Sequence, residues 1–217
     1  GSILSKLGRH KEALVSYDQA IELNPEYCEA YLNRGLSLAA IGEYEDAVKS
    51  YNKAITISPH KPELYYNRAI AFQAMKYAEQ ALESYNQAIE INPEYAKAIH
   101  NRGITLFVLR RWAEAIASFE QAKRIDPKIA YLDGMLLHNK MWLCDWGSYP
   151  ADLNKIAQSI LEGRKAALSF PVLTLIDSPG LHRKSAEIWV ADQFQKNLIL
   201  GEIPKRKRTD KIRLAYF

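Results

Sequence analysis

The segment from residue 26 to residue 59, EYCEAYLNRGLSLAAIGEYEDAVKSYNKAITISP, contains the pattern that decides the fold. Its closing proline recurs every 34 residues, at Pro25, Pro59, Pro93 and Pro127. Three further columns keep this spacing: an alanine five residues before each proline, an aromatic residue eight before it, and a second alanine twelve before it. A strict period of this length predicts an array of stacked repeats rather than one globular core.

Each unit is predicted to form two amphipathic helices. In the second unit, apolar residues recur at helical spacing over residues 31–39 and again over 47–55, and Gly42 lies between them as the turn. Small residues such as Gly35 would let the paired helices approach closely, and the aromatic residue would fill the gap beside them. The proline cannot continue the second helix, so it indicates the step to the next unit.

This pattern resembles the tetratricopeptide repeat (TPR) from Gly1 to about Pro127. The resemblance implies an all-α fold, a right-handed TPR superhelix (α-solenoid), with the first helix of each pair on its concave face. Ala69 replaces the glycine of the third unit, and Ile99 replaces the leading aromatic residue of the fourth. The first unit is truncated, with its first helix reduced to residues 3–7, so we expect this chain to be a piece of a longer protein.

Helical patterns continue after the marker columns stop at Ile129. We expect three further helices that pack against the last repeat: one over residues 130–146, one capped by Asp152 and ended by Gly163, and one from Ser178-Pro179 to about residue 194. Residues 211–217 alternate polar and apolar side chains and predict an orphan terminal strand. The predicted domains are four TPR units (1–127), capping or connecting helices (128–195), a basic linker (196–211) and the first strand of a missing catalytic domain (212–217).

Charge and composition exclude several classes of protein. Residues 1–127 carry 15 Lys+Arg and 16 Asp+Glu, and residues 128–217 carry 14 and 9, so the basic character lies in the second part, mainly in the run from Lys205 to Arg213. A neutral array argues against nucleic-acid binding. The sequence has no apolar run long enough for a membrane helix and no visible secretory signal, so a cytoplasmic protein is expected. Cys28 and Cys144 are expected to be free, buried thiols, and the scattered histidines and cysteines predict neither a metal site nor a cofactor.

A polar column marks the predicted concave face. Two residues before the glycine or alanine of successive first helices stand Asn33, Asn67 and Asn101. A carboxamide carries a donor and an acceptor, so such a ladder can pair with the backbone of an extended polypeptide and show little side-chain preference. From the spacing alone, an alternative stays open, in which each asparagine fixes its own repeat by bonding to a neighbouring loop.

Two other columns accompany this ladder. Three residues after the asparagines stand apolar residues, Leu36, Ile70 and Ile104, which we expect to help bind the peptide. They argue against a clamp for a C-terminal carboxylate, which would need lysines along these helices. One residue after the asparagines stand Arg34, Arg68 and Arg102, which we expect to lie over apolar surface and pair with local carboxylates rather than with a ligand.

Three segments carry a second resemblance: residues 137–146, residues 176–190 and residues 211–217. They resemble the junction between repeats and catalytic lobes in the bacterial and SPINDLY-like branch of the protein O-GlcNAc transferases, although Phe170-Pro171 departs from the expected proline-before-phenylalanine order. In that family a TPR superhelix feeds substrate polypeptide to a glycosyltransferase, and asparagines in the ladder column hold the substrate backbone. The catalytic histidine and the nucleotide-sugar site would lie beyond residue 217, so no catalytic residue is assigned.

The sequence therefore predicts the substrate-recognition scaffold of an O-GlcNAc-transferase-like enzyme, inactive by itself, whose parent is a UDP-sugar-dependent protein O-glycosyltransferase. The alternative is a stand-alone TPR adaptor for protein–protein interaction. The expected partners are extended segments of other proteins, and a second copy of the chain through exposed array ends around Leu4 and Leu7. We expect no nucleic-acid and no membrane partner.

Overall fold

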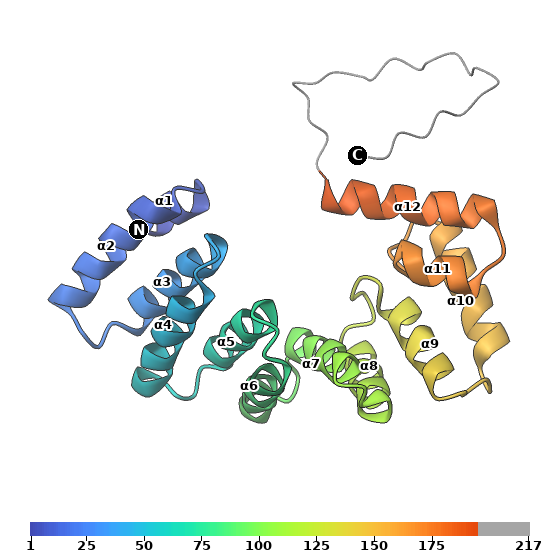
Figure 1. Ribbon diagram of the computed structural model, residues 1–217, viewed down its shortest axis with the longest axis horizontal. Helices are drawn as coiled ribbons and strands as arrows, with labels where there is room; N and C mark the ends of the chain where they lie inside the picture. The colour runs from blue at the N-terminus through green and yellow to red at the C-terminus, as the bar shows by residue number, and fades with distance from the viewer. Residues whose placement is uncertain (195–217) are drawn as a thin grey trace, which may run out of the picture.

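The computed structural model describes residues 1–194, and that part of the chain folds into helices joined by short connections (Figure 1). The helices are α1 (Ser2–Lys6), α2 (His10–Leu23), α3 (Cys28–Ala40), α4 (Tyr44–Ile57), α5 (Pro62–Ala74), α6 (Ala78–Ile91), α7 (Ala96–Val108), α8 (Trp112–Ile125), α9 (Leu132–Trp142), α10 (Tyr149–Leu161), α11 (Ser169–Leu175) and α12 (Pro179–Gln193). The predicted linker and terminal strand lie outside the described residues.

Helices α1 to α8 form four antiparallel pairs that follow one another along a curve (Figure 1). The first helix of each pair, α1, α3, α5 or α7, lies on the inner side of this curve, and its partner lies on the outer side. The prediction of an all-helical solenoid from the 34-residue period is confirmed for this part of the chain.

Close contacts between a glycine and an aromatic ring hold the pairs together. A Cβ atom added at Gly35 would lie 2.5 Å from Cε1 of Tyr51, and one added at Gly103 would lie 2.6 Å from Cε1 of Phe119. Real Cβ atoms do not approach so closely, so each ring occupies the space that a side chain at the glycine would need. The predicted role of the small and aromatic columns is confirmed at both units.

The turn between the paired helices recurs with the same backbone geometry. At 34-residue intervals the chain enters the left-handed region, at Gly8, Gly42, Lys76, Arg110 and Cys144. The next residue then donates its N–H to a carbonyl five residues back, as in Arg111 to Leu106 (2.9 Å) and Asp145 to Lys140 (3.0 Å). This is the Schellman type of helix end. The backbone frame of the array therefore appears once more, at the end of α9, although the sequence markers stop at Ile129.

The segment after the array differs in three details from the sequence prediction. Among the described residues it contains four helices rather than the three predicted. The additional helix is the short α11, which spans 7 residues and includes Pro171. Helix α9 is shorter than the predicted 130–146. Asp152 does not cap α10: it lies in the first turn and accepts a hydrogen bond from Ser148 Oγ at 2.7 Å.

Other predicted helix ends are confirmed. Ser178 is the N-cap of α12 and accepts from the N–H of Leu181 at 3.5 Å. Gly163 follows α10 with φ of 79°, a conformation that glycine adopts without steric cost. Cys28 is buried as expected, whereas Cys144 is exposed because it lies in the turn after α9.

Helix α9 connects the array to the last three helices. Its residues Leu132 and Leu136 join the apolar cluster around Phe119, and Leu137 joins a second cluster with Ile156. The N–H of Gly134 donates to the carbonyl of Ala166 at 2.9 Å. Helix α9 thus packs against the fourth repeat with some of its residues and against the C-terminal helices with others.

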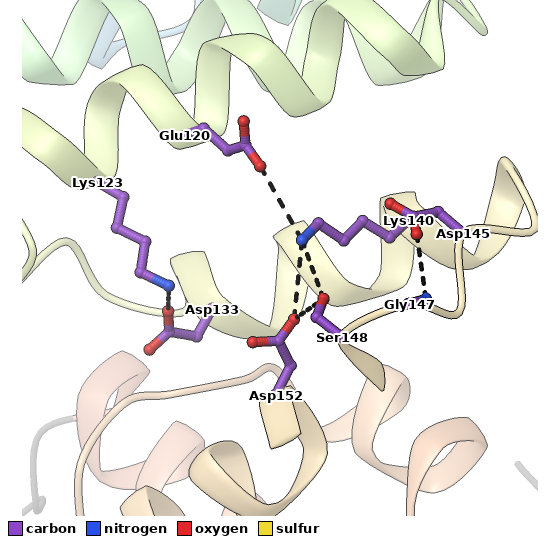
Figure 2. Close-up of polar contacts among 8 residues, drawn as sticks. All are labelled: Glu120, Lys123, Asp133, Lys140, Asp145, Gly147, Ser148 and Asp152. Carbon is purple, nitrogen blue, oxygen red and sulfur yellow. Dashed lines mark hydrogen bonds and ion pairs between the residues drawn. The ribbon is translucent and has the colours of Figure 1, made fainter. Parts of the chain in front are cut away.

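A polar network crosses the same junction (Figure 2). Lys140 on α9 donates to Ser148 Oγ at 3.3 Å, and its Nζ lies 3.8 Å from Asp152 and 4.0 Å from Glu120. Lys140 thus links α9 to α8 and to the start of α10. Among the helices of residues 1–194, none is long and apolar enough to cross a membrane.

Candidate peptide-binding face

The ladder asparagines stand at the same position of α3, α5 and α7, and all three are half-exposed. Residues three and seven positions further on lie on the same side of a helix. They form two more rows, one of Leu36, Ile70 and Ile104 and one of Ala40, Ala74 and Val108. We call the surface formed by the asparagines and these two rows the inner face.

The row next to the asparagines is apolar and partly open to solvent. Leu36 is 41% exposed and Ile70 is 37% exposed. Ile104 is half-buried and packs against the core cluster of the fourth unit. This row can therefore contribute apolar area to a bound chain, with more at the second and third units than at the fourth.

The asparagine side chains make few contacts with the rest of the protein. Asn67 donates to the carbonyl of Glu63 in its own helix at 2.8 Å, and Asn101 donates to Tyr66 Oη at a long 3.4 Å. Within residues 1–194, Asn33 forms no hydrogen bond with its side chain, and no ladder asparagine bonds to a neighbouring loop. The carboxamide oxygens of all three are therefore open to a donor from another chain.

A network of hydrogen bonds that was not predicted from the sequence leads to the backbone of Asn101. Tyr85 donates to Gln73, Gln73 donates to Thr105 at 3.1 Å, and Thr105 donates to the carbonyl of Asn101 at 2.9 Å. Burial raises the pKa of Tyr85 far above its usual value, so its hydroxyl stays a donor at neutral pH. The network links α5, α6 and α7 and fixes the ladder position on α7.

The arginines that follow the ladder asparagines form hydrogen bonds within the repeats. They reach buried serines of the second helices, in the pairs Arg34–Ser50 (2.7 Å), Arg68–Ser84 (3.1 Å) and Arg102–Ser118 (3.1 Å). Within the described part of the chain, only Arg34 also has the expected carboxylate partner, Asp18 at 2.7 Å. The expectation of carboxylate pairing is therefore wrong for the other two, because serine, asparagine and glutamine side chains stand within their reach instead.

Four aromatic side chains gather where α7, α8 and α9 meet. Trp112 and Trp142 stack with ring centroids 5.4 Å apart and an interplanar angle of 17°, and Phe107 lies 5.2 Å from Trp112 and 6.0 Å from His138. The indole N–H of Trp142 donates to Nε2 of His138 at 3.2 Å. We call these four residues the tryptophan cluster.

We expect the tryptophan cluster to make the protein sensitive to acid. Burial lowers the pKa of His138, so the unfolded chain takes up a proton first as the pH falls below the ordinary histidine value of about 6.5. The stabilising effect of neutral His138 is complete above that value and is lost as the pH falls further, because protonated Nε2 cannot accept from Trp142. Between pH 7 and 5 we expect the wild type to lose roughly 2 °C more in Tm than His138→Gln, whose amide does not titrate.

The matched control for this experiment is His60→Gln, since His60 is exposed on the loop before α5. Thermal melts followed by circular dichroism across the pH range give the comparison. The same pH dependence in wild type, His138→Gln and His60→Gln would contradict the prediction.

Family models identify the repeats. A model described as TPR repeat matches residues 1–42, 35–76 and 78–109, and a model described as tetratricopeptide repeat matches residues 96–129. Together these matches span more than half of the chain. No curated protein matched the sequence.

Several solved structures share the fold. The crystal structure of MamA matches with a TM-score of 0.63 and 17% identity over 87% of this chain and 94% of that one. YrrB, described as a TPR protein with an unusual peptide-binding site, matches with a TM-score of 0.63 and 18% identity over 86% and 88%. The first TPR of Spaghetti (RPAP3), bound to the HSP90 peptide SRMEEVD, matches with a TM-score of 0.53 and 26% identity over 54% of this chain and 93% of that one.

Proposed function

Because residues 1–129 of this chain belong to the tetratricopeptide-repeat family, we propose that the chain is a protein-binding scaffold whose inner face holds an extended segment of another protein. The ladder asparagines bind the backbone of that segment, and the neighbouring apolar row contacts its side chains. The segment is held in extended form because only then do its amide and carbonyl groups project free of internal hydrogen bonds.

The observation that carries this proposal is the repeated, open carboxamide. Asn33, Asn67 and Asn101 occupy equivalent places on three successive inner helices, are half-exposed, and leave their oxygens without a partner among the described residues. Packed helices lie about 8–10 Å apart, and an extended chain rises about 3.3 Å per residue. Each asparagine would therefore meet roughly every third residue of the bound segment.

One of the solved structures that share the fold also holds a peptide, which supports a peptide ligand. The first TPR of Spaghetti, which matches 54% of this chain at 26% identity, is bound to a peptide. The apolar side chains Leu36, Ile70 and Ile104 on the inner face of this chain favour an internal segment over a charged C-terminus.

We propose further that the parent protein is an O-GlcNAc-transferase-like, UDP-sugar-dependent glycosyltransferase, for which this non-catalytic scaffold selects substrates in the cytoplasm. Support comes from the three motifs at residues 137–146, 176–190 and 211–217, which resemble the junction of that family. A stand-alone adaptor would use the same inner face. The coding sequence of the parent separates the two, since the transferase requires several hundred further residues of alternating strands and helices.

Backbone recognition makes a testable prediction about modified peptides. An uncharged, extended peptide of about nine residues spans three units. N-methylation of alternate amides removes donors without changing the side chains, and we expect it to weaken binding roughly tenfold, because each lost hydrogen bond is worth about 0.5–1.5 kcal/mol. Fluorescence anisotropy of the labelled peptides with the whole chain measures the difference.

The control peptide has the same composition in scrambled order and unmodified amides. Recognition through the backbone leaves its affinity close to that of the parent peptide. If scrambling abolishes binding while N-methylation has no effect, the inner face recognises side chains and the ladder proposal is wrong.

A further inference from the structure

The inner face continues beyond its last asparagine onto α9. This helix ends in the same turn as α3, α5 and α7, so its residues can be assigned to the same positions. Met135, His138 and Trp142 stand 34 residues after Asn101, Ile104 and Val108. Because Leu132 and Leu136 pack into the core of the fourth unit, α9 takes the place of a fifth inner helix.

The third row of the inner face increases in apolar size along the array. Its members after the first unit are Ala40, Ala74, Val108 and Trp142, and each is exposed. Val108 is 64% exposed and Trp142 is 56% exposed. The face thus offers small side chains at the second and third units and a broad apolar surface at the end where α7 and α9 lie.

The exposed part of Trp142 has no polar group to offer. One ring face stacks on Trp112, and the indole N–H is already bound to His138. The exposed positive charge of Arg110 beside the cluster disfavours a cationic ligand, whereas the charge of Lys140 is compensated by two carboxylates. Arg110 is exposed between Val108 and Trp112, and Lys140 extends toward Glu120 and Asp152 at the interface with α8 and α10 (Figure 2).

We propose that Val108 and Trp142, supported by Phe107 and Trp112, form a subsite for one uncharged apolar side chain, leucine, phenylalanine or proline, of the polypeptide held by the ladder. This inference rests on the proposed function and deepens it. The asparagines hold any extended backbone, whereas the subsite selects a side chain and so sets the register in which the segment is bound. Continuity with the inner face, and an exposed aromatic surface whose indole N–H is already bound, favour an apolar occupant.

The test uses labelled peptides of about nine residues with a serine and threonine background and one central residue, which is Leu, Phe, Pro, Ser, Lys or Glu. We expect the apolar peptides to bind about three- to tenfold more tightly than the serine peptide. Val108→Ser should remove this preference, so that the apolar peptides and the serine peptide bind with similar affinity. Val15→Ser is the matched control, because Val15 is 58% exposed but lies on the outer helix α2.

A second variant and a second measurement keep the test decisive. Trp142→Ala should also remove the preference, and Val108→Ser decides the matter if this variant does not fold. A photoreactive benzoylphenylalanine at the central position should crosslink to residues 107–112 or to Trp142. If Val108→Ser still prefers apolar peptides, or if crosslinks are confined to α3 and α5, the subsite proposal is wrong and the ladder proposal stands. If no peptide binds at all, both proposals are wrong.

Discussion

Replacing Phe119 with alanine is expected to be the most destabilising single change in the array. Phe119 is fully buried on α8, its ring fills the space left by Gly103, and His100 lies 5.7 Å away. Removing a buried phenylalanine side chain typically costs about 3–5 kcal/mol, since the apolar transfer energy is lost and a cavity remains. We expect Tm to fall by roughly 6–20 °C.

The damage should extend to both neighbours of α8. Phe119 belongs to the apolar cluster that also contains Ile99 of α7 and Leu132 of α9, and repeat arrays are stabilised by such contacts between adjacent units. Amide exchange should therefore become faster in α7, α8 and α9 before it changes in α3 and α4. This pattern distinguishes a local loss of packing from a general destabilisation.

The same substitution on the surface provides the control. Phe170 lies on α11 and is 71% exposed, so Phe170→Ala leaves no cavity and should change Tm by no more than about 2 °C. Thermal melts of the two variants beside the wild type are sufficient. Equal melting temperatures for Phe119→Ala and wild type would show that the glycine–aromatic contacts do not hold the pairs together.

The helix pairs could be predicted because their marker residues recur in the sequence. The left-handed turn that also recurs in each unit could not be predicted in the same way. Gly42 was predicted as a turn, whereas Lys76, Arg110 and Cys144 adopt the same left-handed conformation without being glycine. A side chain in this region costs about 1–2 kcal/mol. The hydrogen bond that closes each turn and the packing of the helices on both sides outweigh that cost, so residue type alone does not reveal the turn.

The continuation of the frame into α9 was missed for a related reason. Leu137 stands where the glycine column would continue, so the usual contact with an aromatic residue on the next helix is absent. Instead, Gly134 lies against the extended segment before α11, where a Cβ atom would come within 2.3 Å of Ala167 Cβ. The close contact has moved by one helical turn and changed its partner, and a search at fixed spacing cannot follow that change.

The candidate site, like the fold, could be predicted only in part from the sequence. The asparagines share one column, so their common face follows from the 34-residue spacing alone. The tryptophan cluster combines Trp112 from the start of α8 with Trp142 from the end of α9, and these residues are not related by the repeat period. Their contact depends on how α9 packs against the fourth unit, which is a tertiary property.

Changing all three ladder asparagines to alanine is expected to give the largest loss of peptide binding. Each provides a donor and an acceptor, and a net hydrogen bond contributes about 0.5–1.5 kcal/mol, so losing one bond at each site weakens binding by between about 10-fold and 2000-fold. The fold should tolerate the change, since the side chains are half-exposed and their contacts are confined to one carbonyl and one long bond to Tyr66. Single variants should show graded losses.

Two measurements test peptide binding by the scaffold and sugar transfer by the proposed parent enzyme independently. In the binding assay the control is Asn86→Ala with Asn154→Ala, since these exposed asparagines lie on α6 and α10, outside the inner face. In the parent protein supplied with UDP-GlcNAc, the triple variant should transfer less sugar to protein substrates while donor hydrolysis stays unchanged, because the ladder positions the polypeptide and leaves the sugar site intact. Wild-type affinity in the triple variant would remove the ladder from peptide binding. Absence of transfer by the unaltered parent with any nucleotide sugar, together with intact binding, would assign the inner face to an adaptor.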